Sequence, residues 1–298
     1  MTRSSPHCTA AILLSSLAAF ACVAHTQEGD GLAPASAPAA QADANLPAQQ
    51  TPARPIRVSG EPEFTLQTRT ATLDDGSTGD MFIAGPMRIN SPLPVGYPRP
   101  TPAGAMEVKH YPSIRRAQLT VEASPRWGMN MAFFPLFRHI KDRDIAMTAP
   151  VEAEVPAMAR EEVETGEPQG GARDQTGEMT VSFLYRTSDM GVAGQAEEDV
   201  VVTDTKPVIV LALGIRGTMG NDRIEREIGK LYDWLDAQGD TNTGPKGEQA
   251  QGAWIADGSP RILGYNGPSV RRADQWWEVQ VPIVWEAMEG TNNEAASS

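Results

Sequence analysis

Cysteine is almost absent from this sequence, which contains two cysteines in 298 residues. Both of them, Cys8 and Cys22, lie close to the N-terminus. The main part of the chain therefore has no thiol for a disulfide framework, a cysteine zinc site or a thiol nucleophile.

Basic residues are scarce relative to acidic ones. The chain has 25 Lys and Arg against 38 Asp and Glu, which gives a formal net charge of −13. Nucleic acids and anionic membrane surfaces are bound through basic patches, so neither is expected as a partner. Hydrophobic residues make up 40% of the sequence, which is enough to bury a core.

Long apolar runs are missing except near the N-terminus. Arg3 precedes an apolar stretch over residues 10–24 that ends in small residues. This stretch is shorter than the roughly 20 residues of a membrane span, and the pattern is typical of a secretory signal peptide. We expect a signal peptide over residues 1–24, an exported protein in the periplasm, the cell envelope or the medium, and no transmembrane span after cleavage. The segment before Cys22 also resembles a lipoprotein box, which leaves a lipid anchor at Cys22 as the alternative.

Three other segments differ in composition from the main domain. Residues 25–60 are rich in Ala, Pro and Gln and have few large apolar side chains, so a disordered linker is predicted. Residues 289–298 form a similar disordered tail. Residues 61–104 combine short alternating runs with many Gly and Pro, and we interpret them as an N-terminal extension over the main domain, which spans residues 105–288.

The main domain contains two similar halves. Apolar residues spaced by three and four predict helices over residues 128–141 and 221–238, the second with Asn221 as N-cap and Gly239 as stop. Each half has the order strand, helix, strand, strand, which indicates an internal duplication and an α+β antiparallel sheet with two helices. The predicted strands lie at residues 106–121, 144–155, 179–186, 200–203, 207–215, 253–255, 261–265 and 276–284. The strand over residues 207–215 is apolar on both faces and is expected to be central in the sheet.

Motifs of the common enzyme classes are missing. The sequence has no HExxH, EF-hand loop or GxSxG motif, so neither a catalytic metal nor a nucleophile triad is predicted. A GxxGxxG segment, Gly214 to Gly220, joins an apolar strand to the second helix, where a phosphate loop would lie. Its spacing differs from GxGxxG, and a tight turn is the favoured interpretation. We therefore expect a protein that is not an enzyme.

The main domain has a conspicuous group of aromatic, methionine and basic side chains. Apolar faces edged by basic residues suit a flat hydrophobic ligand with carboxylates, such as a porphyrin, and ordinary core packing is the alternative. On the first predicted helix and just beyond it the group consists of Met129, Met131, Phe133, Phe134, Phe137, Arg138, Lys141 and Arg143. On and before the last strand it consists of Arg271, Arg272, Trp276, Trp277 and Trp285. The main domain also contains two histidines, His110 and His139.

The segment from Met147 to Val151, M-T-A-P-V, follows the first predicted helix and resembles a signature of the SOUL haem-binding family. Three other segments resemble the family in the same order, at residues 106–121, 207–217 and 264–283. The resemblance covers residues 105–283. The chain departs from the family pattern at His139, where the helix commonly has tyrosine, and at Ala273 and Asp274, where the ending has Asn-Glu.

The resemblance implies a twisted antiparallel sheet, or distorted β-barrel, with two helices and pseudo-twofold symmetry. It also implies haem or tetrapyrrole binding in a shallow hydrophobic cleft, without catalysis. On this hypothesis Met129, Phe133, Phe137 and Trp277 contact the ring and Arg138 and Lys141 lie near the propionates. His139 or His110 is then the candidate axial ligand.

The function expected from the sequence is that of an exported, non-catalytic haem- or tetrapyrrole-binding protein, whose partner is a small hydrophobic ligand. Two alternatives remain open. One is a binding module for another small apolar effector, and the other is an envelope interaction protein without a ligand.

Overall fold

The computed structural model describes residues 54–73, 76, 78–158, 177–197, 199–239 and 241–287. These residues belong to one compact unit, Ala48–Ser298. The predicted signal peptide with Cys22, most of the predicted linker and the C-terminal tail lie outside the described residues. In the described part of the chain, no helix is long and apolar enough to cross a membrane.

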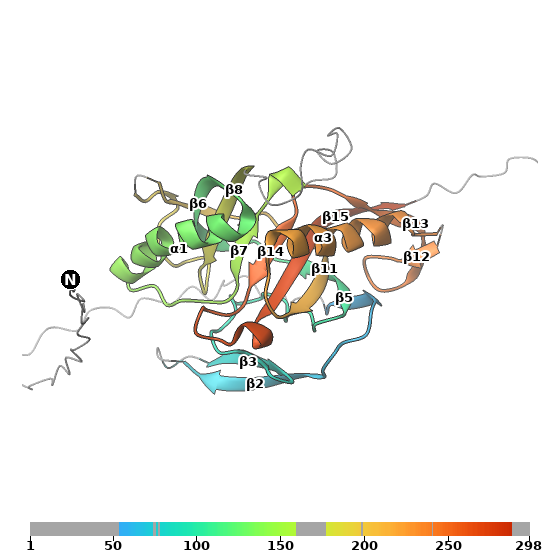
Figure 1. Cartoon of the computed structure of the whole chain (residues 1–298), viewed down its shortest axis with the longest axis horizontal. Coiled ribbons are helices and arrows are strands. Elements are labelled where there is room, and N and C mark those ends of the chain that lie inside the picture. Colours follow the sequence, from blue (N-terminus) through green and yellow to red (C-terminus); the bar gives the residue numbers. More distant parts are fainter. Residues whose placement is uncertain are drawn as a thin grey trace, which may run out of the picture. The chain divides into compact units, whose positions relative to one another are not determined.

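A twelve-stranded antiparallel sheet forms the centre of the fold (Figure 1). Its strand order is β1-β5-β11-β15-β14-β7-β8-β6-β10-β9, with β13 paired to β15 and β12 paired to β13. Among the described residues the end strands β1 and β9 do not pair with each other, so the sheet is open there. The strands are β1 (Ile56–Ser59), β5 (Met106–Tyr111), β6 (Arg115–Ala123), β7 (Val151–Glu154), β8 (Gly177–Leu184), β9 (Gly194–Gln195), β10 (Val201–Asp204), β11 (Val208–Arg216), β12 (Thr241–Thr243), β13 (Gln249–Ala256), β14 (Arg261–Gly264) and β15 (Trp276–Ala287).

The strand order confirms the duplication predicted from the sequence. The β14–β7 pair lies at the centre of this symmetry. Outward from it, the order β14, β15, β11 on one side corresponds to the order β7, β8, β6 on the other. The first strand of each half pairs with the other half. In the first half β5 pairs with β11 of the second half, and in the second half β10 pairs with β6 of the first. Each half therefore depends on the other to complete its part of the sheet. The apolar strand β11 is central, as predicted, between β5 and β15.

Two helices cover one face of the sheet (Figure 1). The helix α1 (Pro125–Asp142) packs on β6 and β8, and α3 (Asn221–Asp236) packs on β15, β13 and β11. Leu136 of α1 and Leu231 of α3 are fully buried in the same core as Val181 and Val279 of the sheet. Short 3-10 helices follow β7 (η1, Pro156–Met158) and precede β15 (η2, Arg272–Asp274).

Only one side of α1 is buried against the sheet. Its fully covered positions include Gly128, Ala132, Leu136 and His139, whereas Phe137 is 41% exposed. Gly128 lies where α1 meets β8, and a Cβ there would lie 1.9 Å from the sulfur of Met179. The missing side chain allows a close approach of the helix to the sheet at this position.

A pair of glycine substitutions tests this close approach. Gly128→Ala is expected to lower the free energy of unfolding by about 1–3 kcal/mol, because the added methyl group overpacks the contact with Met179. Gly229→Ala is the matched control in α3, where a Cβ meets no atom within 4 Å. It should raise stability by about 0.5–1 kcal/mol through helix propensity. Urea unfolding of both variants measures the contrast, and equal effects would contradict this packing.

The GxxGxxG segment forms the tight turn between β11 and α3, with Gly217 at a φ of 101°. The predicted start of the helix at residue 221 is confirmed, but both predicted capping residues are wrong. Gly220 is the N-cap and Asn221 the first helical residue, and the helix ends at the Ala237 cap before Gly239 is reached.

The N-terminal extension packs against the sheet face opposite the helices. It contains a separate sheet of β2 (Leu66–Thr72), β3 (Thr78–Ala84) and β4 (Met87–Ile89). Met87 and Leu93 of the extension share a core with Leu263 and Trp276 of the main sheet. Ile262, the neighbour of Leu263, belongs to the core on the helix side, as the alternation of a strand requires.

Several charged side chains are buried beneath this extension. Lys109 Nζ donates to both carboxylate oxygens of Glu278, at 2.9 and 3.0 Å, and both side chains are 0% exposed. Glu278 Oε1 also accepts hydrogen bonds from Thr101 N–H and Tyr265 O–H, each at 2.7 Å. The ion pair is therefore enclosed by hydrogen-bonding partners from the extension and from the segment that follows β14.

Candidate functional site

One side of α1 is apolar and faces solvent. We call it the α1 face and define it as Trp127, Met131, Phe134, Phe137, Arg138 and Lys141. Residues 127, 131, 134, 138 and 141 are spaced by four and three, so they follow one side of the helix. The exposed fractions are 68% for Trp127, 54% for Met131, 72% for Phe134 and 41% for Phe137. Monomeric proteins rarely leave such a continuous group uncovered, and an exposed apolar patch of this kind marks a binding surface.

The C-terminal half of the α1 face borders a shallow depression of about 390 Å³. Phe134 and Phe137 supply its apolar surface, and Arg138, Lys141 and Asp142 supply its charged edge. Arg138 and Lys141 are exposed and have no ion pair within the described part of the chain. Their charges remain available to an anionic group of a ligand.

Two predicted contact residues support this surface from below. Phe133 is partly buried and stacks on Phe137, with ring centroids 5.8 Å apart and an interplanar angle of 9°. Its other side meets Phe183 of β8 edge to face at 5.3 Å. Met129 is also partly buried against the core. Phe133 thus fixes the orientation of Phe137, and Met129 contributes little exposed surface.

His139, a predicted axial ligand, is 0% exposed and engaged at both ring nitrogens. Nε2 lies 2.7 Å from the hydroxyl of Tyr185, and Nδ1 lies 3.3 Å from Oε1 of Glu197. Arg143 donates to the same carboxylate oxygen at 2.6 Å. In this arrangement neither ring nitrogen is open to iron, because His139 ties the end of α1 to β8 and to the segment before β10. Burial, followed by the nearby Arg143 charge, lowers the pKa of His139 below its usual 6.5.

This shift predicts a pH dependence of stability. Because the folded protein holds His139 neutral below the pKa of the unfolded state, the unfolded chain binds more protons as the pH falls. The free energy of unfolding should therefore decline below about pH 6.5. Urea unfolding at about pH 7.5 and about pH 5.5 should show the decline in the parent protein and a smaller one in His139→Gln. An equal decline in both proteins would contradict this role of His139.

The other two predicted residues lie away from the α1 face. His110 is on β5, which is separated from β6 and β8 beneath α1 by several strands. Trp277 is on β15, half-buried, with its ring against Gly264 of β14. His110 Nε2 and Trp277 Nε1 are both buried without a hydrogen-bond partner among the described residues. The described part of the chain also contains no group of three or more His, Cys, Asp or Glu side chains that could hold a metal ion.

Three members of the α1 face are not among the ring contacts predicted from the sequence. Met131 and Phe134 belong to the predicted aromatic group, and the structure exposes both of them. Trp127 lies before the predicted start of the helix, which in fact begins at Pro125. The spacing of 127, 131, 134, 138 and 141 is the signal that could have identified this side.

Comparison with protein families gives one match. Residues 99–281 match the family described as SOUL heme-binding protein, which is more than half of the chain. The chain therefore belongs to the SOUL haem-binding family, as its sequence motifs predict. No curated protein sequence matches it.

Several solved structures of low sequence identity align with part of this chain. The crystal structure of the EcmrR C-terminal domain aligns with a TM-score of 0.43 at 11% identity, over 61% of this chain and 98% of that domain. A structure of EcmrR in complex with DNA aligns with the same TM-score and identity, over 61% of this chain and 57% of the longer EcmrR chain. A structure titled as a hydrolase from Listeria innocua aligns with a TM-score of 0.41 at 10% identity, over 62% of this chain and 94% of that one.

Proposed function

We propose that this chain is an exported, non-catalytic haem- or tetrapyrrole-binding protein that holds the ring against the α1 face. Membership of the SOUL haem-binding family supports the ligand class. The signal-like sequence of residues 1–24 supports export. The absence of the common catalytic motifs from the sequence supports a binding role without catalysis.

The observation that carries the proposal is the exposure of four large apolar side chains beside two basic ones. Trp127, Met131 and Phe134 are each more than half exposed. Covering a side chain of this size with a flat apolar ligand contributes about 1.5–3 kcal/mol. Such a ligand would shield from water the apolar side chains of the α1 face, which the fold leaves exposed.

The side chains on the α1 face fit the chemistry of a haem. The aromatic rings would contact the porphyrin plane, and Arg138 and Lys141 would pair with its propionate carboxylates. Bound haem would supply a strong Soret absorption and a redox-active iron. Because both nitrogens of His139 are engaged, the proposal assigns binding to apolar contact and charge pairing.

Titration of haem into the purified chain tests the function. A saturable shift of the Soret band at micromolar haem is expected, and no shift would overturn the proposal. Iron-free protoporphyrin should bind with an affinity within about threefold of that of haem, because the described contacts do not involve the metal. Stabilisation by other amphiphiles in a thermal-shift screen, with no response to haem, would favour the alternative of another apolar effector.

A further inference from the structure

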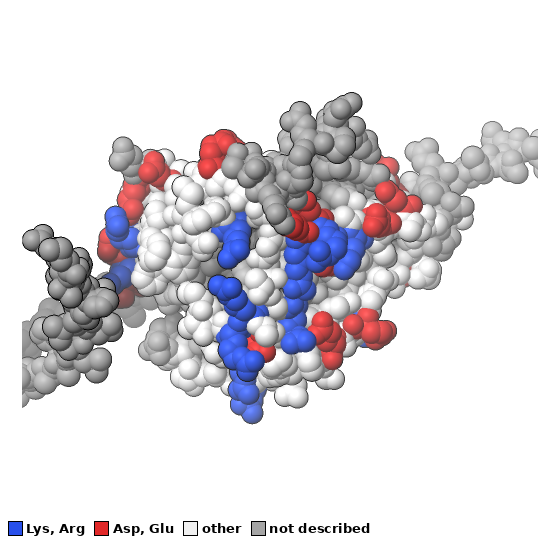
Figure 2. Space-filling model, in the orientation of Figure 1, with Lys and Arg blue, Asp and Glu red and all other residues white. Residues whose placement is uncertain are grey.

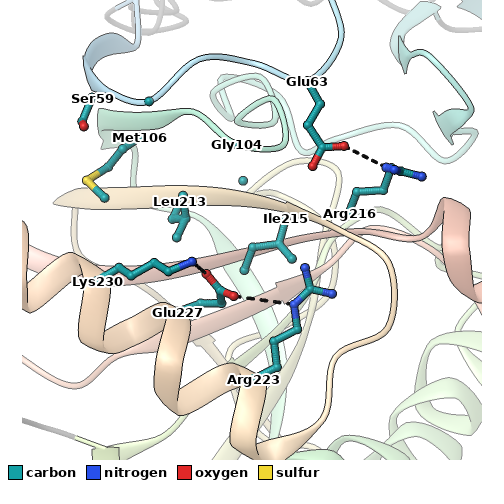
Figure 3. Close-up of a pocket in the computed structure, with 12 residues that line it drawn as sticks. Ser59, Glu63, Gly104, Met106, Leu213, Ile215, Arg216, Arg223, Glu227 and Lys230 are labelled. Carbon is teal, nitrogen blue, oxygen red and sulfur yellow. Dashed lines mark hydrogen bonds and ion pairs between the residues drawn. The ribbon is translucent and has the colours of Figure 1, made fainter.

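A second cavity, of about 300 Å³, lies between α3 and residues 59–63, at the end of the main sheet (Figure 3). Its apolar floor is formed by Met106 of β5 and by Leu213 and Ile215 of β11. Arg223, Glu227 and Lys230 line it from α3, while Glu63 and Arg216 lie on its opposite side (Figure 3). None of these residues belongs to the α1 face, so the cavity is a separate site.

The rim of this cavity is built from closely packed backbone. Gly104 N–H donates to the carbonyl of Gly214 at 2.9 Å, and Gly214 N–H donates to Ala105 at 3.1 Å. A Cβ on Gly60 would lie 2.2 Å from the Gly104 carbonyl oxygen, and one on Gly214 would lie 2.3 Å from the Pro102 carbonyl oxygen. Glycine is therefore required at these positions, and the rim has a fixed shape.

The α3 wall carries more positive than negative charge. Glu227, whose side chain is 8% exposed, lies 2.6 Å from Lys230, 3.2 Å from Arg226 and 3.7 Å from Arg223. Burial acts to raise the pKa of Glu227, but Lys230 and Arg226 outweigh it and lower the pKa, so the carboxylate is ionised. One carboxylate thus faces three cations. On the far side, Arg216 is matched by Glu63 at 2.9 Å.

Ion pairing within the helix accounts for part of this arrangement, because Arg223 and Lys230 lie four and three residues from Glu227. The helix dipole does not account for it, because α3 has no basic residue in its last turn, where cations are favoured, and ends near Asp233 and Asp236. Its basic side chains lie instead along the turns beside the cavity. Figure 2 shows Lys and Arg gathered over and below α3 in the middle of this face, in a chain whose net charge is −13.

Arg223 and Lys230 both retain donors for a ligand. Lys230 has three N–H groups, of which one is directed at Glu227. Arg223 Nη1 donates to the Thr218 carbonyl at 3.0 Å, which leaves further guanidinium N–H groups. Charge-assisted hydrogen bonds from Arg and Lys are strong and suit a carboxylate.

We propose that this cavity binds a small amphipathic carboxylate, with its anionic group held by Arg223 and Lys230 and its apolar part on Met106, Leu213 and Ile215. Pockets with an apolar surface and a few convergent polar groups are typical small-molecule sites. This site goes beyond the proposed haem function and does not depend on it.

Octanoate is a suitable probe, because it combines a carboxylate with an apolar chain. Two control compounds each lack one of these parts: 1-octanol is neutral, and inorganic phosphate has no apolar part. Calorimetry on the full chain should show saturable octanoate binding, with at least about tenfold weaker binding of the other two. Methyl NMR should show shifts at Met106, Leu213 and Ile215. Absence of octanoate binding, equal binding of either counterpart, or shifts confined to the α1 face would overturn the proposal.

Matched variants assign the binding to the cations. Arg223→Gln with Lys230→Met should weaken octanoate binding about tenfold or more. The control, Arg69→Gln with Lys206→Met, removes the same charges at exposed positions elsewhere and should leave binding unchanged. Glu227→Gln removes the competing carboxylate and should strengthen binding. Equal affinities in the first variant and its control, in chains with parent-like circular dichroism, or weaker binding in Glu227→Gln, would overturn the assignment.

Discussion

Replacing Lys109 with methionine is expected to lower the free energy of unfolding by about 3–5 kcal/mol. In this variant Glu278 would remain buried without the ammonium that lies 2.9 Å from it. For a domain of this size the loss corresponds to a fall in Tm of about 6–20 °C. Burial opposes ionisation of Glu278, but Lys109, Tyr265 and Thr101 together hold its pKa below the usual value. The variant removes the largest of these stabilising interactions.

A second substitution separates the charge from the packing. Adding Glu278→Gln to Lys109→Met leaves no uncompensated charge and keeps an acceptor for Tyr265 O–H. The double variant should therefore be at least about 1 kcal/mol more stable than the sum of the two single effects predicts. Denaturant unfolding measures all three proteins. A loss below about 1 kcal/mol in Lys109→Met, or strict additivity, would contradict the role of the pair.

The combined substitution Phe134→Ser and Phe137→Ser is expected to weaken haem binding about a hundredfold. Each ring that a ligand covers contributes on the order of 1.5–3 kcal/mol, which corresponds to about tenfold or more in affinity. The fold should tolerate the change, since Phe134 is 72% and Phe137 is 41% exposed. A loss of stability below about 1.5 kcal/mol is expected. Soret titration and urea unfolding of the same preparation measure the two quantities.

Exposed apolar residues elsewhere provide the control. Val192 is 86% exposed and Ile255 on β13 is 40% exposed. Val192→Ser with Ile255→Ser removes apolar surface without changing the α1 face, so haem affinity should remain within about twofold of the parent value. Equal weakening in both double variants would show that the effect does not come from the α1 face.

The order of the elements could be predicted from the sequence because each half repeats strong local patterns. The apolar stripe with Ile228 and Leu231 predicted α3, and the apolar run of β11 predicted a central strand. The exchange of β5 and β10 between the halves depends on pairing between distant segments. Periodicity along one strand carries no information about which partner it pairs with, so the exchange became visible only in the structure.

The candidate site could be predicted in part. Phe137, Arg138 and Lys141 do lie together. The exposure of Phe134 and the burial of His139 depend on how α1 packs on the sheet, which includes the contact of Gly128 with Met179, a residue distant in sequence. The burial of the charged pair Lys109 and Glu278 also depends on a contact between segments that are distant in sequence. Lys109 and Glu278 alternate with apolar residues as if they faced solvent, but the N-terminal extension covers that side of the sheet.

Binding of haem to the α1 face can be tested directly by NMR of the full chain with substoichiometric ferric haem. The paramagnetic iron broadens signals of nearby nuclei, so selective loss of the signals of Trp127, Met131, Phe134 and Phe137 is expected. The signals of Leu213, Ile215 and Lys230 around the α3 cavity should remain sharp. Broadening centred on the α3 cavity, or a Soret shift without any localised broadening, would contradict binding of haem to the α1 face.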